Sequence, residues 1–322
     1  MESLLVIPVF IPHSGCPHQC AFCNQAIITR HSIAASQKSG LPNPEDIDNI
    51  IHQYLGYKAN RSRVELAFFG GNFVGLADPD IVRLLEQVRP YIENRTIHSI
   101  RCSTRPDTIT EQKLDLISAH GVSLIELGVQ SMTDAVLERA HRGHTCFHTC
   151  QAIGLLKERS IKVGVQVMVG LPGDTRNQLL ASTQQVADLA PDVARIYPLL
   201  VLKGSLLARW YREGRYIPLD LDQSVDLVKE MVKIFEQATV AVIRMGLQAS
   251  EMMEDKTQVL AGPWHPAFGH LVLSALVYDQ VCEKLGYFQG LSRGEQIVLS
   301  IHPRFESRLR GDKNSNLEKL RQ

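Results

Sequence analysis

Three cysteines near the start of the chain have the spacing that most clearly allows chemistry. Cys16, Cys20 and Cys23 form a C-x3-C-x2-C pattern just after the first apolar run. A structural zinc site closes with four protein ligands, and no fourth Cys or His follows Cys23 at a ligand-like offset. Thiolates select iron-sulfur clusters or zinc, and a 4Fe-4S cube held by three of them leaves one iron open to a small chelating molecule. The pattern favours such a cluster; a zinc loop or buried thiols are the alternatives.

A second motif with chemical meaning is the pair Gly70 and Gly71, which directly follows an apolar run. Glycines at such a turn allow the backbone to approach a ligand closely. Taken alone, a Gly-Gly pair is more often only a tight turn. Whether this pair contacts a ligand depends on where the surrounding strands and helices place it.

Short apolar runs alternate with amphipathic stretches over the first 200 residues, which is typical of repeated βα units. The predicted strands cover residues 4–11, 64–69, 97–103, 123–129, 162–169 and 193–200, and the predicted helices cover residues 44–57, 78–91, 110–120, 133–140, 145–159 and 175–189. Six such units predict an α/β fold, a partial TIM-type (β/α)6 barrel. Loops at the carboxyl ends of its strands would carry the functional residues.

The regular alternation of apolar runs and amphipathic stretches ends after residue 200. A helix is expected over residues 221–238, then a short strand over 240–245 and an apolar helix over 268–285. No repeat or low-complexity linker divides the chain. We therefore expect a barrel with the cluster site over residues 1–200, and a C-terminal, α-rich elaboration over residues 201–322 that packs on it.

The overall composition points to no particular polymer or surface. Lys plus Arg and Asp plus Glu number 34 each, so there is no global field to attract nucleic acid or membrane. There is no N-terminal leader pattern and no uncharged apolar stretch of about twenty residues. The seven cysteines suit a reducing compartment. We expect a cytoplasmic protein that does not associate with membranes.

Further motifs follow in a recognisable order: STRPD at 103–107, ELGVQS at 126–131, HRGHT at 141–145 and GLPG at 170–173. With the cysteine loop and the Gly-Gly turn, they resemble the radical S-adenosylmethionine (radical SAM) superfamily. They closely resemble the branch that contains the Elongator catalytic subunit and its shorter bacterial relatives. The resemblance runs from residue 7 to about residue 250 and resumes at GPWHPAFG and IHPRFESRLRG. It implies a 4Fe-4S cluster and SAM as cofactors, the cluster supplying an electron that generates a 5'-deoxyadenosyl radical.

The resemblance assigns SAM contacts to particular positions. The backbone of Gly70, Gly71 and Asn72 matches the segment that receives the methionyl amino group. Many relatives carry Glu, Ser or Thr where Asn72 stands, so the role of its side chain is open. Arg142 matches the arginine that pairs with the SAM carboxylate, a task that suits a planar fork of donors. The alternative for Arg142 is a solvated cation at a helix end.

Other expected SAM contacts lie at strand ends. The resemblance places Gln130 and Gln166 beside the ribose or the methionyl group. Ser103 stands where several relatives carry a glutamate that contacts SAM, so that contact would be weaker or replaced. Gly170 and Gly173 would shape the loop around adenine.

The substrate is less defined than the cofactors. The Elongator resemblance implies radical chemistry on the wobble uridine of tRNA, which makes tRNA a partner to consider beside SAM and a reducing electron donor. The chain ends at Gln322 without the acetyltransferase domain of that subunit, so acetyl transfer is not expected. The alternatives are an enzyme resembling oxygen-independent coproporphyrinogen oxidase, which shares LGVQS and GLP, and a non-catalytic cluster or haem carrier.

Three further features remain open at this stage. Cys146 and Cys150 share one face of a predicted helix, and could be plain thiols or part of an auxiliary cluster or redox pair. His265 could carry protons near the substrate or only hold the last long helix. Residues 304–321 carry six Lys or Arg against three acidic residues, which suits a solvated terminus or contact with RNA phosphates.

Overall fold

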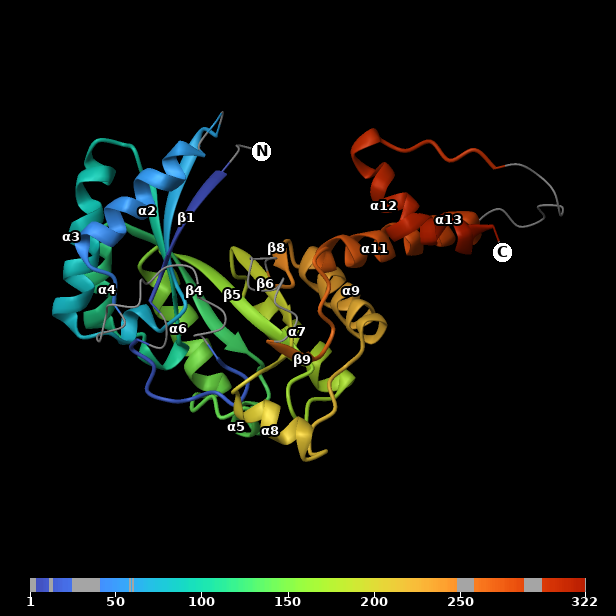
Figure 1. Cartoon of the computed structure of the whole chain (residues 1–322), viewed down its shortest axis with the longest axis horizontal. Coiled ribbons are helices and arrows are strands. Elements are labelled where there is room, and N and C mark those ends of the chain that lie inside the picture. Colours follow the sequence, from blue (N-terminus) through green and yellow to red (C-terminus); the bar gives the residue numbers. More distant parts are fainter. Residues whose placement is uncertain are drawn as a thin grey trace.

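The computed structural model describes residues 4–11, 14–24, 41–57, 59, 61–247, 258–286 and 297–321. At its centre lies a seven-stranded sheet in which all neighbouring strands run parallel, in the order β1-β2-β3-β4-β5-β6-β8. The sheet curves into a half-barrel (Figure 1). Its strands are β1 (Leu4–Phe10), β2 (Arg63–Phe69), β3 (Ser99–Thr104), β4 (Val122–Gln130), β5 (Lys162–Val169), β6 (Val193–Pro198) and β8 (Ala241–Met245).

Helices connect successive strands, as a parallel sheet requires. They are α2 (Pro44–Gly56), α3 (Asp78–Glu93), α4 (Glu111–Ser118), α5 (Asp134–Arg139), α6 (Cys146–Glu158), α7 (Arg176–Asp188), α8 (Leu206–Arg212) and α9 (Leu221–Gln237). Local sequence fixes several starts. Asn43 caps α2 in a reciprocal arrangement with Asp46, and Pro44 occupies the first turn, where its missing N–H costs nothing. Asp220 and Gln223 form the same arrangement at the start of α9.

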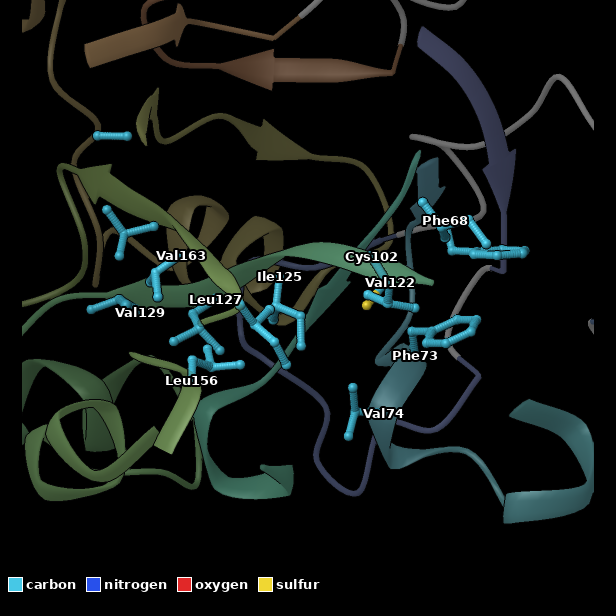
Figure 2. Close-up of a cluster of buried hydrophobic side chains, with 14 of the residues drawn as sticks. Phe68, Phe73, Val74, Cys102, Val122, Ile125, Leu127, Val129, Leu156 and Val163 are labelled. Atoms are coloured by element: carbon cyan, nitrogen blue, oxygen red, sulfur yellow. The ribbon is translucent and has the colours of Figure 1, made fainter. Parts of the chain in front are cut away.

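The main core lies between the outer face of the sheet and these helices. Alternate residues of each strand point into it, for example Ile125, Leu127 and Val129 of β4. Figure 2 shows this cluster, with Leu156 of α6 beside the β4 side chains. Phe68 of β2 stacks on Phe73 with ring centroids 4.7 Å apart. The other set of alternate residues therefore faces the concave side of the half-barrel.

The fold class is confirmed, with one change in strand number. The prediction of six barrel strands was too low, because β8 pairs parallel with β6 and extends the sheet. The strand was predicted, but as part of the C-terminal elaboration. Two of its five residues are exposed and three are partly buried, whereas β4 and β5 consist mostly of buried residues. The helix α9 makes the crossover from β6 to β8, with α8 and the short strand β7 (Val201–Leu202) preceding it.

The C-terminal part begins with β9 (Val259–Ala261), which pairs antiparallel with β7. The helices α11 (Phe268–Gly286), α12 (Glu306–Arg310) and α13 (Ser315–Leu320) follow. Figure 1 shows these three helices extending away from the sheet as one projecting group. The nitrogen Nδ1 of His265 accepts a hydrogen bond from the Ala267 amide at 3.1 Å, directly before α11. This contact agrees with the structural role considered for His265.

Within the described ranges, no helix is both long enough and apolar enough to cross a membrane.

Candidate functional site

The loop that carries the three cysteines follows β1 at the carboxyl edge of the sheet. Cys20 is buried, while Cys16 and Cys23 are partly buried. Backbone hydrogen bonds hold the loop to other parts of the chain. The Ala21 amide donates to the Ala140 carbonyl at 3.0 Å, and the Leu207 amide donates to the Ala21 carbonyl at 2.7 Å. The loop is thus attached to the end of α5 and to the first turn of α8.

The Gly-Gly turn after β2 lies directly against the start of this loop. A Cβ atom at Gly71 would overlap the carbonyl oxygens of Ser14 and Ile11. Gly70 has a φ of 100°, in the region that favours glycine. Gly71 therefore has a packing reason, because the end of β2 and the backbone that leads into the cysteine loop approach too closely for a side chain, and Gly70 has a conformational one.

Asn72 connects the cysteine loop to the end of β3. Its side chain is fully buried. The side-chain Nδ2 donates to the Gly15 carbonyl at 2.7 Å. The side-chain Oδ1 accepts from Thr104 Oγ1 at 2.5 Å, from the Arg105 amide at 2.9 Å and from Thr108 Oγ1 at 3.0 Å. Both polar atoms of the Asn72 side chain therefore join two loops of the protein.

Arg105 continues this connection toward α5. Its guanidinium binds the Asp107 carboxylate through two hydrogen bonds, each 2.9 Å long. The same guanidinium donates through Nη2 to the carbonyl oxygen of Arg142. The bidentate pair holds the pKa of Asp107 below its usual range, against the opposing effect of burial. Asp107 is therefore an anchor for Arg105 and stays ionised at neutral pH.

Arg142 reaches the cysteine loop itself. Only 6% of this residue is exposed. Its Nη1 donates to Cys20 Sγ at 3.0 Å, and its Nη2 donates to the Gly128 carbonyl at 2.7 Å. Near this loop, Arg142 Nε and Arg105 Nη1 are buried and have no hydrogen-bond partner among the described residues. Arg142 is thus a buried residue of the site, and the solvated-cation alternative is excluded.

The electrostatic surroundings of Cys16 combine two opposing influences. Burial is the main cause that raises its pKa, and the neighbouring Cys20 acts in the same direction. The positive charges of Arg105 and Arg142 act in the opposite direction. The Cys16 thiol therefore lies near two guanidinium groups that favour its thiolate form. Among the described residues, no three Cys, His, Asp or Glu side chains converge tightly enough to hold a single metal ion.

The predicted strand-end residues lie on three neighbouring strands, β3, β4 and β5. Gln130, the last residue of β4, is buried and has a φ of 69°, which is rare for a residue other than glycine. Gln166 of β5 donates through Nε2 to Gln130 Oε1 at 3.4 Å, so the two amides lie together. Ser103 of β3 is partly buried and pairs in register with Glu126 of β4.

A buried charge network on these strands was not predicted. Arg101 of β3 binds both Glu65 of β2 and Glu126 of β4. Arg195 of β6 binds the same Glu126 oxygen at 2.7 Å and donates to the Tyr197 hydroxyl at 3.3 Å. Two guanidinium groups are thus matched by two carboxylates in the interior. The matching keeps the network close to neutral, as buried charges require.

A cavity of about 570 Å³ lies against the cysteine loop. It is lined by His18, Gln19, Asp134, Glu138, His141, Gly143, His144 and Thr145. Burial lowers the pKa of His144 to about 3, and the positive charges of Arg142 and Arg105 add to the effect. His144 is therefore neutral at physiological pH. None of the expected SAM contacts lines this cavity, although His141 and Gly143 flank Arg142 in the sequence.

Comparison with known proteins identifies the family. Residues 10–186 match the model described as the radical SAM superfamily, and residues 191–277 match its C-terminal domain model. The first match covers more than half of the chain and contains the whole cysteine loop. The chain belongs to the radical SAM superfamily. The members of this superfamily are enzymes whose cofactors are a 4Fe-4S cluster and SAM, as the resemblance implied.

Curated relatives of this radical SAM protein come from archaea, bacteria and eukaryotes. A tRNA uridine(34) acetyltransferase of Methanocaldococcus jannaschii is 24% identical over 263 residues, which cover 71% of this chain and 48% of that protein. The protein YhcC of Escherichia coli K12 is 26% identical over 218 residues, 66% of this chain and 67% of that protein. The chain spans about half the length of the acetyltransferase it matches.

Among solved structures, the archaeal Methanocaldococcus infernus Elp3 superposes with a TM-score of 0.66 and 22% identity, covering 89% of this chain and 64% of that chain. At this level of identity the likeness concerns the fold. It agrees with the half-barrel and its C-terminal helices.

The residues present fit the family's cofactors on chemical grounds. Three thiols lie on one loop, and each would bind a different iron of a cube, so convergence on one point is not required. Buried guanidinium N–H groups without partners stand next to that loop. Cys146 and Cys150 lie on α6 as free thiols, and neither belongs to a potential metal-holding group of described residues.

Sequence interpretation missed Thr104, Arg105, Asp107 and Thr108, although STRPD was recognised as a motif. The signal was an Arg and an Asp two residues apart directly after a strand, a spacing that allows a local ion pair at the functional edge of a barrel.

Proposed function

We propose that Cys16, Cys20 and Cys23 hold a 4Fe-4S cluster whose open iron binds SAM, and that the enzyme uses the resulting 5'-deoxyadenosyl radical to abstract hydrogen from its substrate. The observation that carries the proposal is the three-cysteine loop, held against the Gly70–Gly71 turn at the carboxyl edge of a half-barrel in a chain of this family. When bound, the cluster supplies the electron that cleaves SAM.

The protein's own residues bind and orient SAM in this proposal. The proposed contacts are the backbone of Gly70, Gly71 and Asn72, and the side chains of Ser103, Gln130, Arg142 and Gln166. The adjacent amides of Gln130, at the end of β4, and Gln166, within β5, support a shared role. The side chain of Asn72 is occupied by loop contacts, so only its backbone is assigned to SAM.

We further propose tRNA as the substrate. The proposal draws on the relative named tRNA uridine(34) acetyltransferase and on the basic C-terminal helices. Arg304 and Arg308 stack on the Phe305 ring, with their Cζ atoms 4.7 and 5.2 Å from its centroid. Arg310 pairs with Glu306 at 3.0 Å and remains exposed. Stacked guanidinium groups present flat, charged surfaces that suit nucleic acid.

Binding to tRNA is tested by salt dependence. Each phosphate neutralised by a cation releases counterions, so affinity should fall steeply with added salt. We expect the double variant Arg304→Gln, Arg310→Gln to bind bulk tRNA more weakly at low salt and to show a shallower salt dependence. The matched control is Arg83→Gln, Arg89→Gln on α3, two exposed arginines that also pair with acidic residues of their own helix. Equal binding of tRNA by both double variants would exclude the C-terminal helices as the contact surface for tRNA.

The reaction is tested by isotope transfer. We expect deuterium to pass into 5'-deoxyadenosine from deuterated tRNA prepared from cells that lack the enzyme. A deuterated small-molecule fraction would serve as the comparison. Transfer from that fraction alone would exclude tRNA and leave the radical chemistry in place.

A further inference from the structure

The Arg142 guanidinium is placed for a second task beside the SAM contact assigned to it. Its Nη1 donates to Cys20 Sγ at 3.0 Å, within the distance accepted for a hydrogen bond to sulfur. Its Nη2 is held by the Gly128 carbonyl. The donor to sulfur therefore sits in a guanidinium that is fixed on both sides, on a residue that is only 6% exposed.

The backbone of Arg142 is fixed as well. The Arg142 amide donates to the Leu137 carbonyl at 2.9 Å, and the Arg142 carbonyl accepts from Arg105 Nη2. Arg105 is itself locked by its two hydrogen bonds to Asp107. A chain of charge-assisted contacts thus runs from Asp107 through Arg105 to Arg142 and ends at the sulfur of Cys20.

The same segment also holds the other end of the cysteine loop. Thr104, Arg105 and Thr108 bind Asn72 Oδ1, and Asn72 Nδ2 binds the Gly15 carbonyl next to Cys16. Residues 104–108 therefore act on the loop at two points, through Asn72 at Gly15 and through Arg142 at Cys20. Such fixed geometry is what allows a hydrogen bond to keep its length when the charge on its acceptor changes.

We propose that Arg142 is a hydrogen-bond donor to the Cys20 thiolate that raises the reduction potential of the cluster, and that Arg105 is the positioning residue that aims it. A cluster gains one negative charge on reduction, and hydrogen bonds to its sulfurs are among the factors that set its potential. A cationic donor favours the more negative, reduced form. The inference rests on the proposed cluster at Cys16, Cys20 and Cys23. It adds to Arg142 a function that acts before SAM binds.

The test is a redox titration of the reconstituted protein without SAM, followed by electron paramagnetic resonance. We expect Arg142→Gln to keep four irons per chain and to lower the midpoint potential by at least about 59 mV, a tenfold change in the equilibrium constant for a one-electron couple. Arg105→Gln should shift the potential in the same direction by a smaller amount. Arg142→Lys retains the charge and should recover part of the shift. The control is Arg139→Gln, an exposed cation of the same chain segment, which should leave the potential unchanged.

A second measurement needs no variant. With 15N-labelled arginine, pulsed electron paramagnetic resonance of the reduced wild-type cluster should show a nitrogen coupling, because the donor nitrogen is in direct contact with a cluster ligand.

The outcomes separate this inference from the proposed function. Wild-type protein that binds no iron overturns both. A cluster with an unchanged potential in Arg142→Gln overturns only the present inference, and a loss of SAM affinity in that variant would then assign Arg142 to SAM alone. If Arg142→Gln fails to hold iron, the absence of a 15N coupling in the wild type decides against the inference.

Discussion

Replacing Asn72 by Ala should both destabilise the protein and loosen the cysteine loop. The side chain is fully buried and joins the loop at Gly15 to the end of β3 through four hydrogen bonds. Alanine removes all four and leaves a small cavity.

The loss of folding free energy depends on which groups lose their only hydrogen-bond partner when Asn72 is replaced. Thr104 Oγ1 lies near Thr108 Oγ1 and the Val74 amide, and Thr108 Oγ1 donates to the Arg105 carbonyl, so both hydroxyl groups keep partners. The Gly15 carbonyl and the Arg105 amide lose theirs. A buried group left unsatisfied costs about 1–3 kcal/mol, so two of them predict a destabilisation of about 2–6 kcal/mol.

The assay is urea unfolding of the iron-free protein under reducing conditions, with iron content measured after reconstitution. Asn316→Ala is the control, because Asn316 is also buried and donates to two backbone carbonyls, of Ser274 and Arg308, far from the cysteine loop. Both variants should lose stability, but only Asn72→Ala should lose iron. Full iron content in Asn72→Ala, with a destabilisation below about 1 kcal/mol, would refute the assigned role.

Three further predictions concern single positions. Burial raises the pKa of Asp174 to about 6, so ionisation of this carboxyl destabilises the fold as pH rises from about 4 to about 6. Asp174→Asn should therefore raise the melting temperature at about pH 8 and much less at about pH 4. Equal increases at both pH values would argue against this role of Asp174. Gly71→Ala should abolish iron binding by displacing the loop, whereas Gly154→Ala, in open space on α6, should be neutral or stabilising by circular dichroism. Cys146→Ala and Cys150→Ala should leave iron content unchanged, and any loss would indicate a second cluster.

The elements that could be predicted are those specified by local pattern. The strand expected over residues 162–169 is β5 to the residue, because its apolar run is bounded by Ser160 and the Gly170 turn. The helix α2 begins at its predicted residue because Asn43 and Pro44 mark its start. Parallel strands with short loops then bring the Gly-Gly turn and the cysteine loop to one edge, as the barrel prediction required.

The contacts between loops could not be predicted, because they join residues far apart in sequence. Nothing local to Asn72 indicates that it would bind Gly15, 57 residues earlier. The resemblance assigned Arg142 a partner outside the protein, whereas its donor to Cys20 depends on the bend of the chain after α5 and on Arg105. The short helices α12 and α13 were also missed, because their sequence is polar and their packing is against α11.

The central claim is that the three-cysteine loop holds a cluster that cleaves SAM. The most direct measurement is formation of 5'-deoxyadenosine and methionine from SAM by the anaerobically reconstituted, chemically reduced protein. We expect the wild type to bind four irons per chain and to form both products, and Cys16→Ser, Cys20→Ser and Cys23→Ser each to lose both properties. Products formed by any of these variants, or a wild type that binds iron and SAM and forms none, would contradict the claim.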